Sequence, residues 1–561
     1  MVGITERSCL FGQRGGVAVS GQCQRLGITQ IMVWRFYLLQ RDYLTARTAG
    51  YCLKMLDYQC PAKKESGNMK LRQQLFSDTE QFRLNLLIQE TVLMKRISTT
   101  KRAAIKFATI ALGWVLLVVM TPAQAQQGSR SNSLLLENAR LIIGDGSVIE
   151  AGSILIEDAN IVAVGNRDEM NLPDNVTRLD LAGKSIIPAL IDAHAHLGYE
   201  AYTSWGEQNY SRENLIDHLQ RYAYYGFSAV FSAGSDPGEL AFSLQRELRD
   251  DQLQVARFLF AAGMAPPGQG PNDQFLKNAL ALEQRTGMTI LYGVGNEQQA
   301  IDAVSEIADR GIPLIKIWVD DRAGTQQKLA PALYRVIIAE ATRRNIPVFV
   351  HQQYAADMPD LIRSGVDGFL HGRIGNDLDQ AIAQQLVQAK AFVVPNLGLA
   401  ELRREAIGED SFLQASVPIS VAKRLSAGSG QRQLKIVRST DSETELKASF
   451  ASLIEAGVDI LLGTDAGAVP DHFFGYSGHR ELEIFVRLGM TPMQALLAAT
   501  SRPAQRLGLV DLGQLKPGYS ADLVVLDSNP LDDIRNTRRI SRVYLRGKEI
   551  DRESMSRKFS N

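Results

Sequence analysis

The chain has 561 residues, enough for two or three domains or for one large barrel with attachments. Its 61 basic and 61 acidic residues balance, so the net charge gives no indication of binding to nucleic acid or to an anionic membrane surface. A hydrophobic fraction of 45% is that of a soluble globular protein.

Residues 94–125 predict a signal peptide. The segment MKRISTTKRAAIK begins at Met94 and has five basic residues and no acidic one. The apolar run Phe107–Met120 follows, and then a small-x-small cleavage site at Ala123 and Ala125. The run is shorter than the roughly 20 residues that a membrane span needs. We therefore expect a periplasmic or secreted protein.

Residues 1–93 are interpreted as a mis-assigned N-terminal extension, with translation starting at Met94. The alternative is a cytoplasmic extension ahead of a signal anchor. All four cysteines fall in this stretch: Cys9, Cys23, Cys52 and Cys60. The mature chain is therefore expected to have no disulfide, no thiolate metal ligand, no cysteine nucleophile and no stable membrane anchor.

The rest of the chain predicts an α/β fold. Residues 133–187 and 509–550 consist of short segments with alternating apolar and polar positions, and we expect them to form one small composite β-sandwich. Between them, residues 188–508 alternate eight strand-like segments with amphipathic ones. This pattern is typical of a (β/α)8 TIM-like barrel, whose active site lies at the carboxyl ends of the strands.

Candidate metal ligands stand at the ends of the predicted strands. The stretch IDAHAH ends in His194 and His196, which lie two residues apart and so point to the same face of a strand. Alone they could be an exposed pair, but three other predicted strands end in His351, His371 and Asp465. Neutral imidazole and carboxylate are good ligands for zinc and similar ions, so we predict a metal centre.

The second prediction concerns the chemical state of a lysine in the middle of an apolar strand. In IPLIKIWV, Lys316 has apolar neighbours, and burial of an unpaired ammonium is costly. A deprotonated lysine can add carbon dioxide to give a carbamate, whose two oxygens can bind two metal ions. The alternative is an ion pair with Asp320 or Asp321. Given the surrounding ligands, we favour the carbamate.

This combination resembles the metal-dependent amidohydrolase superfamily, close to its imidazolonepropionase- and prolidase-like branch. The resemblance covers residues 133–550 and includes IDAHAH, IKIW, GTDAG and the tail ATSRPAQRLGLVDLGQLKPGYSADLVVLD. It departs at Ala189, where the family usually has glycine. By resemblance, one metal is held by His194, His196 and Asp465, the other by His351 and His371, and carboxylated Lys316 bridges them.

The predicted activity is hydrolysis of amide or peptide-type C–N bonds, in dipeptides or N-acyl amino acids. Two divalent ions, with zinc expected and manganese, iron or cobalt also suited to these ligands, can share a hydroxide nucleophile. Asp465 is the expected proton carrier. Related deaminases have a glutamate three residues after the strand-five histidine, where this chain has Tyr354.

Two alternatives remain at this point. The same site could hydrolyse lactones or other esters. A member of another class, a secreted non-catalytic binding protein, could keep the barrel, but such a protein would be expected to lose ligands, and all six are present.

Four further residues are candidates for substrate binding. Tyr354 could donate a hydrogen bond to a substrate carbonyl or carboxylate, which makes it a candidate catalytic residue, and Arg373 could bind a carboxylate bidentately. His472 and His479 follow strand eight and would border the site. The alternatives are a rim tyrosine, a surface arginine and, for His479, the first turn of the next helix. The partner is a small molecule or short peptide rather than nucleic acid, and a homo-oligomer is compatible with the sequence.

Overall fold

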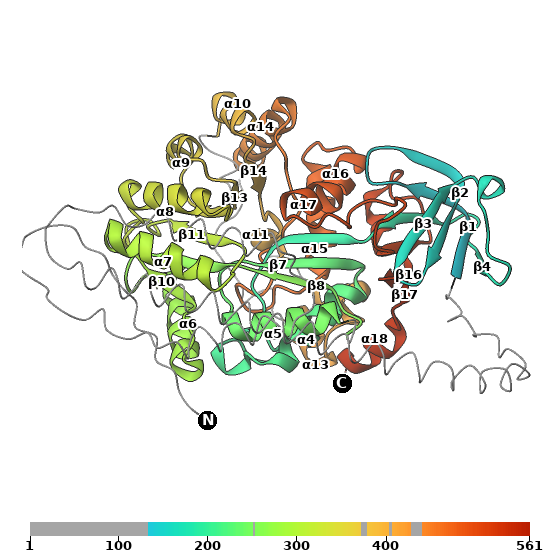
Figure 1. Cartoon of the computed structure of the whole chain (residues 1–561), viewed down its shortest axis with the longest axis horizontal. Coiled ribbons are helices and arrows are strands. Elements are labelled where there is room, and N and C mark those ends of the chain that lie inside the picture. The colour runs from blue at the N-terminus through green and yellow to red at the C-terminus, as the bar shows by residue number, and fades with distance from the viewer. Residues whose placement is uncertain are drawn as a thin grey trace, which may run out of the picture. The chain divides into compact units, whose positions relative to one another are not determined.

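The computed structural model describes residues 133–250, 253–371, 378–402, 405, 407–427 and 440–560 (Figure 1). The predicted extension, the predicted signal peptide and Arg373 lie outside these described residues. Within the described part of the chain, no helix is long and apolar enough to span a membrane.

Strands from both ends of the described chain form one eight-stranded sheet (Figure 1). The strand order is β17-β16-β15-β5-β1-β2-β3, and β4 also pairs with β1. Antiparallel pairing of β5 with β15 joins the two ends. The strands are β1 (Ser133–Ile142), β2 (Val148–Glu157), β3 (Asn160–Gly165), β4 (Thr177–Asp180), β5 (Ser185–Pro188), β15 (Leu523–Leu526), β16 (Ile540–Leu545) and β17 (Lys548–Glu549).

The central part contains parallel strands in two sheets. One sheet has the order β6-β7-β8, with β6 (Leu190–Ala195), β7 (Phe227–Ser232) and β8 (Arg257–Phe260). The other has the order β10-β9-β11-β12-β13-β14. Its strands are β9 (Ala262–Ala265), β10 (Leu291–Gly293), β11 (Ile315–Val319), β12 (Val348–Gln352), β13 (Gly368–Leu370) and β14 (Phe392–Val394). The short strand β10 was not predicted.

Backbone hydrogen bonds connect these two sheets at both edges. On one side, β8 and β9 are separated by a single residue, so one predicted strand pairs with β7 and then with β11. On the other side lies the segment VDILLGTDAG, which was predicted as the eighth strand of the barrel. Its residues 458–466 form isolated parallel bridges, Val393 with Ile460 and Ala195 with Ala466. This segment therefore lies between β14 and β6.

Helices connect the strands, and side chains at their N-termini explain where several of them begin. The carbonyl oxygens of the Asn272 and Asn296 side chains accept hydrogen bonds from backbone amides of the first turn, as helix caps do. The helices are α4 (Arg212–Tyr224), α5 (Gly238–Arg249), α6 (Asp273–Thr286), α7 (Glu297–Asp309), α8 (Pro331–Arg343), α9 (Met358–Ser364), α10 (Gln380–Ala389), α11 (Gly398–Leu402), α12 (Ser411–Gln414), α13 (Ile419–Ala427), α14 (Thr440–Ala456), α15 (Tyr476–Arg487), α16 (Pro492–Ala499), α17 (Ser501–Arg506) and α18 (Arg552–Ser560).

An aromatic core on the inner side of the parallel strands determines where two candidate ligands lie. The ring centroids of Phe231 and Phe349 are 5.4 Å apart, and those of Phe349 and Phe392 are 4.9 Å apart. Because side chains alternate along a strand, His351 lies on the same side of β12 as Phe349. By the same rule Lys316 lies on the side of Leu314, which belongs to this core.

Candidate metal centre

Three imidazoles surround one buried carboxylate at the strand ends. The Nε2 atoms of His194 and His196 lie 3.5 and 3.3 Å from Oδ1 of Asp465, and Nε2 of His371 lies 3.7 Å from its Oδ2. The ligand atoms of His194, His196 and Asp465 are all within 4.8 Å of one another.

The other two predicted ligands adjoin this group. The rings of His351 and His371 are 4.6 Å apart between centroids, and those of His194 and His371 are 4.9 Å apart. Lys316 Nζ lies 3.5 Å from Nε2 of His194. The structure therefore brings all six predicted ligands into one chain of contacts.

The state of Asp465 fits a cation. Its Oδ1 is buried and makes no hydrogen bond of acceptable geometry with a described residue. Burial alone would raise the pKa of Asp465, but the neighbouring histidines, His194 foremost, outweigh this and hold the pKa well below its usual range. An ionised buried carboxylate with imidazole nitrogens converging on it is a donor set that zinc and related ions bind.

The backbone at the strand ends is in a conformation that side chains rarely adopt. His371, Asn396 and Asp465 have φ values of 80°, 50° and 60°. Such left-handed residues cost free energy and tend to cluster at functional sites. A Cβ atom on Gly467 would lie 2.0 Å from the carbonyl oxygen of His196, which explains why GTDAG has glycine there.

Two side chains that were not predicted as site residues lie within hydrogen-bond distance of His194 and His196. Asn396 Oδ1 lies 2.8 Å from Nδ1 of His194, and Ser235 Oγ lies 3.1 Å from Nδ1 of His196. With Nδ1 occupied, each ring presents Nε2 towards Asp465. Such outer partners fix the orientation of metal-binding histidines.

Asp192, within IDAHAH, connects β6 to residues 458–466 through hydrogen bonds. Its Oδ1 accepts hydrogen bonds from the backbone amides of His194 and Thr464, both at 3.1 Å. Its Oδ2 accepts from the hydroxyls of Thr464, at 2.6 Å, and of Tyr222, at 2.7 Å. Burial raises the pKa of Asp192 to about 6, against these hydrogen bonds. The residue thereby fixes the distance between His194 and Asp465.

Lys316 is fully buried, and the ion pair considered as an alternative is not formed. Among the described residues no carboxylate forms an ion pair with Lys316. Asp320 instead accepts a hydrogen bond from Nε2 of His351, at 2.8 Å, and forms an ion pair with Nε of Arg322, at 3.0 Å. Burial lowers the pKa of Lys316 to about 7, although Asp465 acts in the opposite direction. A substantial neutral fraction at neutral pH follows.

Tyr354 lies on the rim and is engaged by the neighbouring loop. Its hydroxyl donates to Oδ1 of Asp321 at 3.0 Å, and Nζ of Lys328 lies 5.3 Å from its ring centroid. The residue is 37% exposed, and its hydroxyl is already paired with Asp321.

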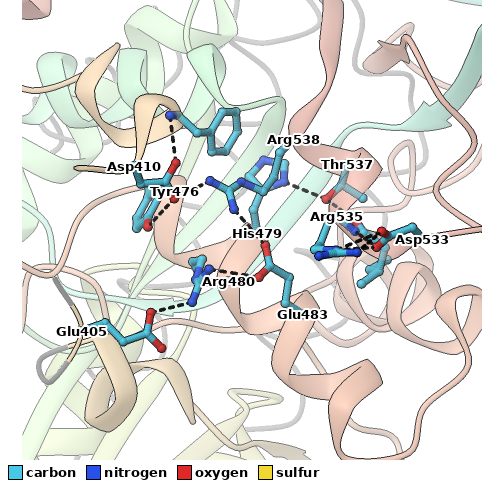
Figure 2. Close-up of polar contacts among 12 residues, drawn as sticks. Glu405, Asp410, Tyr476, His479, Arg480, Glu483, Asp533, Arg535, Thr537 and Arg538 are labelled. Carbon is cyan, nitrogen blue, oxygen red and sulfur yellow. Dashed lines mark hydrogen bonds and ion pairs between the residues drawn. The ribbon is translucent and has the colours of Figure 1, made fainter. Parts of the chain in front are cut away.

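Of the two histidines expected at the border of the site, His472 lies beside the segment that carries Asp465, whereas His479 lies elsewhere. The Nε2 of His472 donates to the backbone carbonyl of Thr464 at 2.7 Å, next to the eighth segment. His479 lies in α15, where both ring nitrogens are within hydrogen-bond distance of protein groups, Thr537 Oγ1 at 3.1 Å and the Tyr225 carbonyl at 2.9 Å (Figure 2). The structure therefore does not bring His479 to the histidine cluster, and the helical alternative describes it.

Comparison with known sequences gives a consistent result. A model of the amidohydrolase family matches residues 185–550. Ochratoxinase from Aspergillus niger is 24% identical over 427 residues, which are 70% of this chain and 81% of that protein. Imidazolonepropionase from Geobacillus kaustophilus is 26% identical over 409 residues, 69% of this chain and 86% of that protein.

Solved structures show that the fold is shared. A Xaa-Pro dipeptidase with bound methionine in its active site matches with a TM-score of 0.56 and 23% identity, over 74% of this chain and 99% of that one. Molinate hydrolase matches with a TM-score of 0.59 and 21% identity, over 76% of this chain and 96% of that one.

Proposed function

This chain belongs to the amidohydrolase family, and on that premise we propose that it hydrolyses amide or peptide-type C–N bonds, in dipeptides or N-acyl amino acids, with two divalent metal ions. One observation carries the proposal. Nε2 of His194 and His196, Oδ1 of Asp465 and Nζ of Lys316 lie close together and buried, and that oxygen has no hydrogen-bond partner among the described residues.

The ligand assignment follows from which atoms are already engaged. His194, His196 and Asp465 would hold one ion, and His351 and His371 the other. Because Nε2 of His351 is bonded to Asp320, its Nδ1 is the atom left for a metal. When bound, divalent ions of this kind lower the pKa of a water ligand and polarise a carbonyl group; zinc is the expected ion.

Lys316 would contribute as a carbamate. Its amine nitrogen, once neutral, forms a bond to the carbon of carbon dioxide and loses one proton to solvent, so a neutral group becomes a buried anion. That change removes the cost of burying an unpaired ammonium and gives the two cations a shared negative ligand. The lowered pKa of Lys316 supports this step.

Asp465 would move the proton. As an ionised group, its carboxylate can accept a proton from the attacking water and return it to the leaving nitrogen. The water oxygen bonds to the acyl carbon, the C–N bond breaks, and the products are a carboxylic acid and an amine.

The finer description of the fold belongs to the same proposal. We infer that the two parallel sheets and residues 458–466 make a closed (β/α)8 barrel over 188–508, supported by the bridges of the eighth segment to β14 and β6. The eight-stranded sheet from 133–187 and 509–550 would be the composite β-sandwich, and the signal at 94–125 would direct export.

The test uses the full chain purified with zinc and bicarbonate. We expect amine release from members of a library of dipeptides and N-acyl amino acids, two metal ions per chain by elemental analysis, and a carbamate signal in 13C NMR after labelling with bicarbonate. Lys316→Ala should lose the signal and the activity, whereas Lys328→Ala, a control on the rim, should keep both.

Other outcomes would overturn the proposal in distinguishable ways. Hydrolysis of lactones or esters without any amine release would replace the amidase by an esterase on the same site. Absence of both turnover and metal would favour the binding protein.

A further inference from the structure

A rim arginine that the sequence analysis did not single out is attached to the metal centre through one carboxylate. Asp320, which is 1% exposed, follows β11 directly. Its Oδ2 lies 2.8 Å from Nε2 of His351 and 3.0 Å from Nε of Arg322. One buried carboxylate oxygen therefore fixes both a candidate ligand and the arginine.

Arg322 is also fixed by its backbone and by a second loop. Its amide donates to Oδ1 of Asp320 at 2.7 Å, and its φ of 49° is left-handed. The same Nε that faces Asp320 donates to the carbonyl of Pro271, which lies in the loop after β9. The arginine thus connects loops that follow neighbouring strands, and its position beside the site is well defined.

The outer edge of the Arg322 guanidinium has no described partner. A guanidinium carries five N–H donors, and only the Nε hydrogen is engaged with described residues. The side chain is 36% exposed, whereas Lys328, the other cation of this loop, binds both oxygens of Asp357 at 2.9 Å. The two Nη atoms of Arg322 form the planar pair of donors that a carboxylate fits.

Its charge reaches the metal ligands. Burial chiefly lowers the pKa of His351 to about 4, and the positive charge of Arg322 acts in the same direction on His351 and on His371. Because Nε2 of His351 and Nε of Arg322 lie 2.8 and 3.0 Å from the same oxygen of Asp320, a group bound at Arg322 lies near the His351 side of the centre.

We propose that Arg322 binds the carboxylate of the substrate, so that the enzyme prefers amides carrying a free acid beyond the scissile bond. This inference rests on the proposed amide hydrolysis and adds the group that selects the substrate. The acyl carbon would then lie between the metal centre and the rim, with Arg322 paired to the acid by two parallel N–H···O bonds.

The experiment compares N-acetyl amino acids with their decarboxylated analogues, the corresponding N-alkyl acetamides, on the zinc-loaded full chain. Turnover and binding, the latter by calorimetry, are measured for wild type, Arg322→Met, Arg322→Lys and the control Lys328→Met. We expect Arg322→Met to raise KM or Kd for the acids about 10- to 100-fold and to change the neutral amides less than about 3-fold. Arg322→Lys should recover part of the loss, and Lys328→Met should behave like wild type.

The outcomes separate this inference from the proposed function. If neutral amides are hydrolysed as well as acids, the function stands and the role of Arg322 is wrong. If acids bind in an Arg322-dependent way and are never cleaved, the inference stands and the function is wrong. Equal losses for acids and neutral amides, with loss of metal, would show that Arg322 only supports Asp320 and His351. Absence of binding and turnover for both classes would overturn both.

Discussion

Two clusters in this molecule that each contain buried histidine and carboxylates differ in how their polar atoms are satisfied. At the strand ends, Asp465 Oδ1 faces imidazole nitrogens more than 3 Å away and makes no well-formed hydrogen bond with described residues. The second cluster lies between α15 and η5 (Ile534–Arg538), and Figure 2 shows its polar contacts.

In the α15–η5 cluster the polar groups bind one another. Arg538 pairs with Asp410 and Glu483, Tyr476 donates to Asp410 at 2.9 Å, and Arg480 pairs with Glu405 at 2.6 Å. His479 is held at both nitrogens, and burial lowers its pKa to about 3, so it is neutral. A buried histidine is therefore no indication of a metal site when both of its nitrogens have protein partners. An ionised oxygen without a well-formed hydrogen bond among several imidazoles is such an indication.

The largest effect is expected at the unsatisfied oxygen. Asp465→Asn keeps the shape of the side chain but removes the proton acceptor and the charge that binds a cation. Activity should fall by about 10²- to 10⁴-fold. Elemental analysis should show loss of metal, while circular dichroism stays like that of wild type. An active Asp465→Asn enzyme with two metals would mean that the centre has been wrongly identified.

A smaller effect is expected one contact further out, at Asn396. Asn396→Gly removes the oxygen that holds Nδ1 of His194 and tolerates the left-handed backbone at this position. Zinc affinity, measured by competition with a chelating dye, should weaken about 10- to 100-fold. Asn396→Asp keeps an acceptor and should bind zinc nearly as wild type does. Equal affinity in both variants would assign Asn396 no role in orientation.

In the α15–η5 cluster, removal of the imidazole should affect stability alone. His479→Ala leaves the Tyr225 carbonyl without its donor and should lower the free energy of unfolding by about 1–3 kcal/mol. Urea titration measures this loss. Metal content and KM should stay at wild-type values, and a loss of metal at unchanged stability would return His479 to the list of site residues.

Whether a site residue could be predicted depends on how far apart in the sequence it and the residues it contacts lie. The convergence of His194, His196, His351, His371 and Asp465 could be predicted because alternation along a strand and the position of strand ends are local features. Asn396 could not, because its bond to His194 joins residues 202 positions apart. Nothing in an asparagine at the end of a strand indicates which histidine it will meet.

Predictions for the loops failed where helix boundaries decide the outcome. His479 was expected at the border of the site because it follows strand eight in sequence, yet α15 begins at Tyr476 and turns the residue towards Thr537. The role of Arg322 could not be predicted, because its position depends on how Asp320, His351 and Pro271, which lie on three different segments, come together in the fold. The fold class needed only the alternation of segments, whereas β10 was not predicted, although β13 and β14 are equally short.

The last expected effect is on the pH dependence of stability and concerns Glu481, which supports the loop containing Asn396. Its carboxylate accepts hydrogen bonds from the backbone amides of Leu397, at 2.8 Å, and Gly398, at 2.6 Å. Burial raises the pKa of Glu481 to about 8, against the effect of these two bonds. Between an unfolded pKa near 4.5 and the folded value, the folded state binds the extra proton, so the contribution of this group to stability falls as pH rises.

Comparison of the unfolding free energies of wild type and Glu481→Gln isolates the titration of Glu481, because the pH dependence of all other residues is common to both proteins. The amide cannot accept from both backbone N–H groups, so the variant should be less stable at pH 5. The gap in unfolding free energy between wild type and variant should then narrow by up to about 1.4 kcal/mol per pH unit towards pH 8. Parallel stability curves would show that the two backbone amides keep the carboxylate ionised throughout, so that the hydrogen bonds outweigh burial at this position.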